Sequence, residues 1–275
     1  MKNKFTVLFD FDSMVYKSVH KIVDFQKIRS WFTEGKTRDW METEIMNLSI
    51  NRLLQMSDGI MIDIEETGIN IESVEYFLTA CKNSVRKKAS TTYKAKRKRN
   101  KWVSIVRQHL LQMEGFIFDD EFEADDLIKD RCVELGSDNY VVCSIDKDLK
   151  QIEGIHFDYY RPVLKNPDGS VVLDVNGFRK VASCVGLSVV SKEEANKFLA
   201  AQMLTGDSCD GVVGLKGIGK VKAGKILKGV NPTDFKEVIL AEYVNHFGCE
   251  EEGQKQFELH LLLLGLGVKY RNFLE

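Results

Sequence analysis

Closely spaced acidic residues recur along this chain beside residues that can bind phosphate. Asp207 and Asp210 lie three positions apart, shortly before the glycine turn Gly217-Ile218-Gly219. Two carboxylates at this spacing can share a hard metal ion, and a glycine turn can present backbone N–H groups to a phosphate. The segment therefore indicates chemistry on the phosphodiesters of a nucleic acid.

Further acids lie where an α/β fold places its ligands. Some close an apolar run typical of a strand, at the end where open α/β sheets bind ligands, and others share one face at the start of a helix. Carboxylates this close repel one another unless a cation lies between them, and their oxygens suit Mg²⁺ or Mn²⁺ and not zinc. Two such ions can promote phosphodiester hydrolysis. We predict as metal ligands Asp10, Glu123, Asp125, Asp126, Asp146, Asp148, Asp207 and Asp210.

Each of these acids also has a purely structural explanation. Glu123 and Asp125 can stabilise the dipole of the helix that they begin, and Asp148 can cap the helix that follows it. Asp207 and Asp210 can shape turns beside their neighbouring glycines. The joint occurrence of the acids in several segments favours the metal site.

The positive charge of the chain is concentrated in one segment. Residues 82–101 contain ten Lys or Arg and no acid, whereas residues 119–130 contain seven acids and one Lys, although the net charge of the chain is only −2. A basic run is often a solvated face or a flexible arm. An acidic cluster that must act on a polyanion nevertheless needs cations nearby, which favours a functional role.

The remaining patterns predict the compartment and the architecture. The six cysteines form no Cys-x-x-Cys pair, and no apolar run approaches membrane-spanning length, so we expect a cytoplasmic protein without membrane contact. Short apolar runs alternate with helical periodicity in the doubly wound manner of a parallel sheet, and helix signals dominate after Val175. We therefore expect an α/β domain over residues 1–174 and a helical lobe over residues 175–275, in which Asp174 caps a helix that reaches about Leu187.

Four motifs, in order along the chain, resemble those of the 5′-nuclease family, which includes flap endonucleases, bacteriophage 5′-exonucleases and the 5′-nuclease domain of DNA polymerase I. They are Phe9-Asp10-Phe11-Asp12, Phe122-Glu123-Ala124-Asp125-Asp126, Ser144-Ile145-Asp146-Lys147-Asp148 and the segment from Gly206 to Gly219. The resemblance implies a PIN-like, mostly parallel sheet with a helical arch over about 82–118, and a helical lobe with a DNA-binding hairpin over about 206–229.

The resemblance also implies roles for the basic residues. Lys94 and Arg97, in Tyr93-Lys94-Ala95-Lys96-Arg97, match the arch residues that act on the scissile phosphate, and the ring of Tyr93 could stack on a base. The residues expected to contact DNA further include Lys87, Lys88, Lys98 and Arg99 in the arch, and Gly217, Gly219, Lys220 and Lys222 in the hairpin, where the family implies a potassium ion.

One position departs from the family pattern. Cys81 stands where an acid is expected, and a thiol is a poor ligand for Mg²⁺. Either a neighbouring acid such as Asp12 compensates, or the alignment has slipped, or the first metal site is weakened.

The predicted function is that of a monomeric, metal-dependent 5′-3′ exonuclease or flap endonuclease. It would act on 5′ ends, flaps or RNA primers during replication or repair in a bacterial or phage-infected cell, with replication proteins as partners. Two alternatives stay open: an RNase H-type nuclease specialised for RNA–DNA hybrids, and a branched-DNA-binding protein with impaired cleavage.

Overall fold

A mixed, mostly parallel sheet forms the centre of the first lobe. The computed structural model describes residues 4–22, 25–80, 84–98, 100–173, 180, 182–183, 185–269 and 271. Within these residues six strands follow the order β3-β2-β1-β4-β5-β6, and β6 is antiparallel to its neighbour β5. The strands are β1 (Lys4–Asp10), β2 (Asn70–Phe77), β3 (Phe116–Ile117), β4 (Tyr140–Cys143), β5 (Gly154–Asp158) and β6 (Gly186–Val190). The expected α/β sheet is confirmed.

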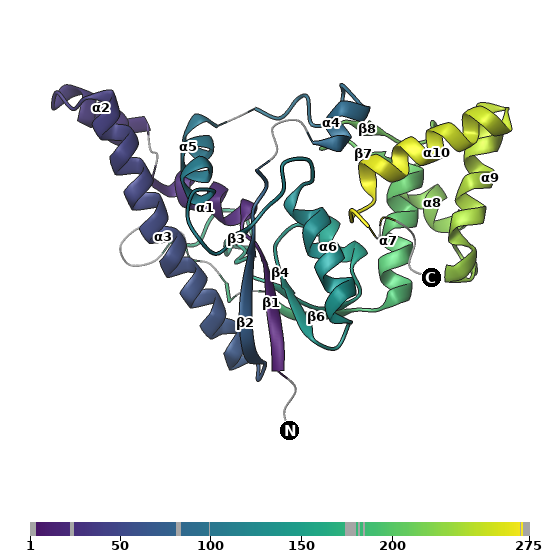
Figure 1. Ribbon diagram of the computed structural model, residues 1–275, viewed down its shortest axis with the longest axis horizontal. Coiled ribbons are helices and arrows are strands. Elements are labelled where there is room, and N and C mark those ends of the chain that lie inside the picture. The colour runs from purple at the N-terminus through teal and green to yellow at the C-terminus, as the bar shows by residue number, and fades with distance from the viewer. Residues whose placement is uncertain are drawn as a thin grey trace.

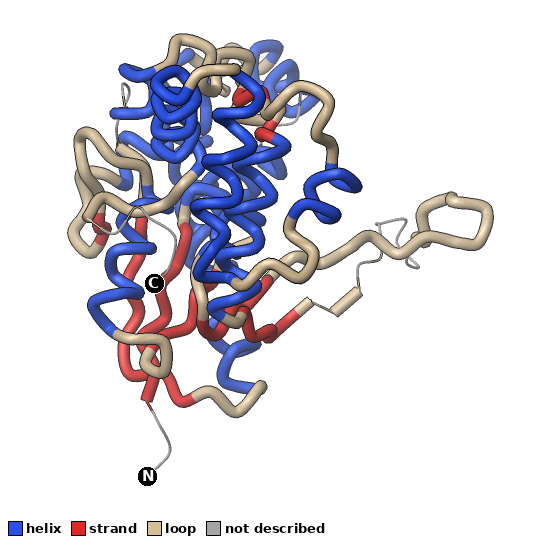
Figure 2. Tube along the Cα trace, turned by 90° about the vertical axis from the view of Figure 1, so that its right-hand side faces the viewer, coloured by secondary structure: helices blue, strands red, loops and turns tan. Residues whose placement is uncertain are grey.

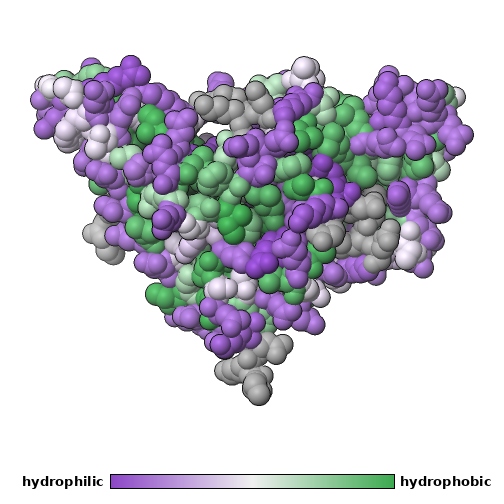
Figure 3. Space-filling view, viewed as in Figure 1, coloured by the Kyte–Doolittle hydropathy of each residue, from purple (hydrophilic) through white to green (hydrophobic). Residues whose placement is uncertain are grey.

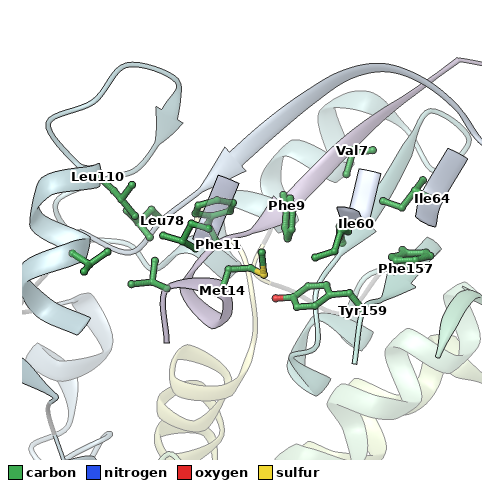
Figure 4. Packing of buried hydrophobic residues seen from close by; sticks show 14 of the residues in the cluster. Val7, Phe9, Phe11, Met14, Ile60, Ile64, Leu78, Leu110, Phe157 and Tyr159 are labelled. Carbon is green, nitrogen blue, oxygen red and sulfur yellow. The ribbon is translucent and has the colours of Figure 1, made fainter. Parts of the chain in front are cut away.

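Alternation along β1 sends apolar side chains to both faces of the sheet. Val7 and Phe9 pack against α1 (Asp12–Ile22), α3 (Arg38–Glu66) and α5 (Lys101–Leu110), in the core of Figure 4. Leu8 packs against α6 (Ala124–Leu135) on the opposite face. Helix α2 (Phe25–Thr33) lies at the far end of the long α3 (Figure 1). Because both faces of the sheet are covered, the strand ends are left to carry ligands.

The second lobe is a helical bundle. It contains α7 (Lys192–Thr205), α8 (Lys220–Ile226), α9 (Phe235–Phe247) and α10 (Glu250–Leu264), with the 3-10 turn η2 (Pro232–Asp234) before α9. The predicted capping box of Ser191 and Glu194 is present at the start of α7. A two-stranded hairpin, β7 (Gly206–Asp207) and β8 (Val212–Val213), leads from α7 towards the glycine turn.

The structure corrects the expected division between the lobes. Residues 186–190 form strand β6 and not the end of a helix, so the sheet continues past residue 174. The segment Gly186-Leu187-Ser188-Val189-Val190 starts at a glycine with φ of 83° and contains β-branched residues, which favour a strand once β5 offers an edge for pairing. Asp174, the expected helix cap, lies outside the described residues.

The expected arch is shorter than residues 82–118. Helix α5 packs through Val103, Val106 and Leu110 into the core of the first lobe, so it belongs to the body of the domain. The part of the segment that lies against the second lobe contains α4 (Val85–Ala89), beside α10, and the turns up to Arg97 (Figure 1). Cys81 and Arg99 lie outside the described residues.

The view in Figure 2 places the six-stranded sheet mainly in the lower part of the molecule, with most helices above it. Hydrophilic side chains dominate the two upper ends, over α2 and over α9 and α10, and hydrophobic ones gather between them (Figure 3). Within the described residues, no helix combines the length and the apolar character needed to cross a bilayer.

Candidate active site

The acids at the strand ends line an open hollow of about 650 Å³. Asp10 ends β1, and Asp146 follows β4, the neighbouring parallel strand. Because the carboxyl ends of parallel strands meet at one edge of the sheet, the two side chains face the same space. The acids that line this hollow are Asp10, Asp12, Glu123, Asp125 and Asp146.

A second, narrow hollow adjoins the first and lies between the lobes. It has room for about 10 Å³, roughly the space that one water molecule or ion needs. Asp125 and Lys94 line both hollows. The acids around the second hollow are Asp125, Asp148, Asp207 and Asp210, so the structure brings acids of both lobes to one place.

Asp10 is the most buried acid of the first hollow, with 2% of its surface exposed. Ser144 Oγ donates a hydrogen bond to Asp10 Oδ2 over 2.7 Å, and Ser13 Oγ donates to the same oxygen over 3.1 Å. Burial and the neighbouring Asp12 nevertheless raise the pKa of Asp10 to about 7. The site therefore carries more negative charge than its own hydrogen bonds can stabilise.

Burial and repulsion between carboxylates also raise the pKa of acids that line the second hollow. Burial, followed by the charges of Asp10 and Asp146, raises the pKa of Asp125 well above its usual value. Burial and the charge of Asp146 raise the pKa of Asp148 to about 6. A divalent cation would relieve this repulsion, and carboxylate oxygens are the donors that Mg²⁺ and Mn²⁺ prefer, so the residues fit such ions.

Cationic side chains hold several of these acids in the structure. Lys94 Nζ lies 2.5 Å from Glu123 Oε2, Arg97 Nη2 lies 2.5 Å from Asp210 Oδ1, and Lys147 Nζ lies 2.6 Å from Asp207 Oδ2. Burial alone would disfavour the charged form of Glu123, but Lys94 and Arg86 lower its pKa to about 2. With these pairs in place, no three acids of the described residues surround a single metal-binding point.

The basic segment is fixed onto the second lobe through its backbone. Lys94 N donates to Asp210 O over 2.7 Å, and Lys94 is the one described non-glycine residue with a positive φ, 52°. Gly211 lies so close that a Cβ atom there would come within 2.4 Å of Thr92 O. The second lobe thus sets the position of Lys94 and Arg97 over the acids.

The structure contradicts the prediction that Tyr93 stacks on a base. Its side chain is 4% exposed and packs in the core of the second lobe with Leu204 and Val212. Its hydroxyl donates to Glu123 Oε2 over 3.2 Å. Tyr93 therefore anchors the basic segment and cannot offer a ring face to DNA in this arrangement.

Asp126, a predicted metal ligand, lies outside the two hollows that the other predicted ligands line. Its side chain instead caps the backbone N–H of Glu123 at the start of α6 and pairs with Arg86 and Arg271. Arg86 Nη2 lies 2.6 Å from Asp126 Oδ1, and Glu123 N donates to Asp126 Oδ2. These bonds occupy both oxygens of Asp126 and give it a structural role that its spacing from Glu123 did not reveal.

The other predicted DNA contacts occupy three kinds of position. Lys87 lines the first hollow. Lys88 pairs with Glu121 over 2.5 Å at the surface, and Lys98 is exposed. In the second lobe Gly217, Gly219, Lys220 and Lys222 are all exposed in the turn before α8 and at its start, and Gly217 has a φ of 83°.

Several residues of the site were not predicted. Tyr16 is 53% exposed on α1 and lines the first hollow, and Lys17 lines it too. Arg107 of α5 lies 2.9 Å from Asp12 Oδ1, and Thr79 N donates to the same oxygen over 3.4 Å. The sequence held a signal for Tyr16, since it lies one helical turn after Asp12, but none for Arg107, which reaches the site only through the packing of α5.

Comparison with known proteins supports the fold. No protein-family model and no curated protein matches the sequence. Among solved structures, the T5 D15 protein co-crystallised with metal ions is 10% identical, with a TM-score of 0.53, over 93% of this chain and 89% of that one. A bacteriophage T5 D15 flap endonuclease variant, in a pseudo-enzyme–product complex with DNA and metal ions, is 12% identical, with a TM-score of 0.50, over 94% and 89%. The chain therefore shares its fold with these T5 D15 structures.

Proposed function

We propose that this protein is a structure-selective, metal-dependent 5′-nuclease that hydrolyses phosphodiesters at 5′ ends, flaps or RNA primers. The observation that carries the proposal is the convergence of acids from both lobes beneath Lys94 and Arg97. Hydrolysis of a phosphodiester uses both the acids and the basic side chains. The acids can hold divalent cations, while lysine and arginine stabilise the charge that develops on the phosphate.

The two hollows divide the proposed metal ligands into two groups. Asp10, Asp12 and Asp146 would serve the first position, and Asp148, Asp207 and Asp210 the second, with Asp125 between them. Mg²⁺ or Mn²⁺, when bound, supplies activation of the attacking water and stabilisation of the leaving oxygen. Asp12, the first residue of α1, accepts a hydrogen bond from Thr79 N just after β2 and is our candidate for the ligand that compensates for Cys81 in the sequence.

Lys94 and Arg97 would exchange partners when DNA binds. They pair with Glu123 and Asp210 in the structure, and the scissile phosphate would compete for the same cations. The exposed ring of Tyr16, in place of Tyr93, would stack on a base of the cut strand. The exposed glycine turn and lysines of the hairpin would hold the duplex, with a potassium ion as a further proposed ligand there.

Cleavage of a 5′-flap duplex in Mg²⁺ tests the proposal. Asp146→Asn should abolish cleavage and retain binding, whereas Asp138→Asn, at the opposite end of the same strand β4, should cut as the wild type does. A wild-type protein that binds the flap but does not cut it in Mg²⁺ or Mn²⁺ would make the enzymatic proposal wrong. Matched RNA-primer and DNA-flap duplexes would rank the two substrate classes.

A further inference from the structure

One acid of the narrow hollow is held by a neutral side chain of the other lobe. Gln202, on α7, is 8% exposed, and its Nε2 donates to Asp148 Oδ1 over 2.7 Å. Lys147 stays 3.9 Å from that carboxylate and pairs with Asp207 at 2.6 Å instead. An amide donor fixes the orientation of a carboxylate without neutralising its charge.

Gln202 is supported in turn by a second buried amide. Gln151, 5% exposed at the end of η1 (Lys147–Gln151), donates through Nε2 to Gln202 Oε1 over 2.8 Å. The same Nε2 donates to Leu264 O over 2.9 Å, and Gln151 Oε1 accepts from Leu266 N over 3.2 Å. A carboxylate and a carbonyl can only accept and a backbone N–H can only donate, so these partners dictate the orientation of both amides.

This chain of hydrogen bonds ends in the turn that follows α10. Leu266 is 5% exposed and packs in the core beneath α6, with Leu8 and Phe77 of the sheet. Gly267 N donates to Asp126 over 3.0 Å, and Arg86 Nη2 donates to Gly265 O over 2.8 Å. The turn is therefore anchored in the first lobe although it belongs to the last helix of the second.

We propose that Gln202 is a positioning residue of the metal site, which orients Asp148 and, through Gln151, makes that orientation depend on the turn at residues 264–267. The proposal rests on the proposed function only in assuming that Asp148 binds a divalent ion. We call the hydrogen bonds that link Asp148, Gln202, Gln151 and the turn a relay. If the relay served only stability, any well-packed side chain could replace Gln202, whereas a positioning role requires a hydrogen-bond donor to Asp148. Outer-shell hydrogen bonds of this kind commonly account for about 10- to 100-fold in metal affinity or activity.

Binding of Mn²⁺ alone, followed by electron paramagnetic resonance without DNA, tests the relay directly. Gln202→Met keeps the length of the side chain and removes its donor, and we expect about tenfold weaker binding of one ion. Gln254→Met, on the exposed face of α10, is the matched control and should bind as the wild type does. In cleavage assays the Mg²⁺ concentration for half-maximal rate should rise by a similar factor, with KM for the flap duplex unchanged.

A second variant tests the direction of the relay. Gln151→Met leaves the bond between Gln202 and Asp148 in place, so it should weaken Mn²⁺ binding less, and the double variant should be no worse than Gln202→Met. If Gln202→Met does not fold, a weakened Mn²⁺ affinity of a folded Gln151→Met still supports the relay, and an unchanged one overturns it.

The outcomes separate this inference from the proposed function. Mn²⁺ affinity of Gln202→Met within twofold of the wild type, with only a lower Tm, would overturn the positioning role. A wild type that binds Mn²⁺ without cutting flap DNA would sink the proposed function and leave the relay standing if Gln202→Met binds more weakly. A wild type that binds no Mn²⁺ would overturn both.

Discussion

The raised pKa of Asp10 predicts that the metal-free protein loses stability as pH rises. Between its unfolded value of 3.8 and its folded value of about 7, the native protein keeps a proton that the unfolded chain has released. Stability from this group is thus fully present below pH 4 and is lost as pH rises through 7. From pH 5 to pH 8 the loss amounts to about 3 kcal/mol, or about 5–10 °C in Tm for a chain of this size.

Other groups titrate in the same pH range, and their contributions to stability must be subtracted by comparison with a variant that retains them. Burial lowers the pKa of His156 and of His260, so each contributes stability that rises with pH through about 6.5, the opposite sign. Asp10→Asn keeps these histidines and lacks only the titrating carboxyl. The difference in Tm between wild type and Asp10→Asn therefore reports the effect of Asp10, including the part that it exerts through Asp125, whose pKa its charge raises.

Thermal unfolding in EDTA at pH 5, 6, 7 and 8 measures that difference. We expect the wild-type Tm to fall by about 5–10 °C relative to Asp10→Asn across this range. Adding Mg²⁺ should restore the wild type more at pH 8 than at pH 5, because protons compete with the metal for the carboxylate. A difference in Tm that stays constant with pH would refute the claim that Asp10 is under electrostatic stress.

Four further changes test the site from different sides. Lys94→Ala should lower single-turnover cleavage by about 10²-fold or more and change duplex affinity far less; an equal loss in both would reduce Lys94 to a phosphate contact. Tyr16→Ala should weaken flap binding by about tenfold, as measured by anisotropy. Replacing Lys220 and Lys222 together by Ala should reduce the salt dependence of duplex binding by about two phosphate contacts. Asp126→Asn should cost about 3 kcal/mol in urea unfolding, because the buried Arg86 and the partly buried Arg271 lose a charged partner, and leave Mn²⁺ affinity unchanged.

The sequence predicted those parts of the fold that depend on local patterns. The apolar run that ends at Asp10 became β1, and the box of Ser191 and Glu194 begins α7. Both signals are carried by neighbouring residues. Strand β6 was missed because its β signal is a five-residue run whose pairing depends on β5, thirty residues earlier.

The orientation of side chains in the site likewise could not be predicted from local sequence patterns. Spacing grouped Glu123 with Asp126, but it could not show that Asp126 faces Arg271 from the far end of the chain, while Asp125 lines the hollow with Glu123. Nor could it distinguish Tyr93, which packs in the second lobe, from Tyr16, which faces the open hollow. These outcomes depend on tertiary contacts, which no local pattern encodes.

The internal ion pairs explain how so acidic a site can exist before substrate arrives. Lys94 lies among acids of both lobes, and burial makes its charge costly unless those acids remain paired with it, whereas the more exposed Arg97 pairs with Asp210. When DNA binds, its phosphodiester can replace the acids as the partner of the two basic side chains. Divalent cations can then replace the basic side chains as the partners of those acids. Binding of DNA alone or of metal alone would leave some of these charges without a partner, so we expect DNA and metal to bind with positive cooperativity. Mn²⁺ affinity measured with and without a flap duplex, using Asp146→Asn to prevent cleavage, should therefore differ, and equal affinities would show that these pairs stay closed when DNA is bound.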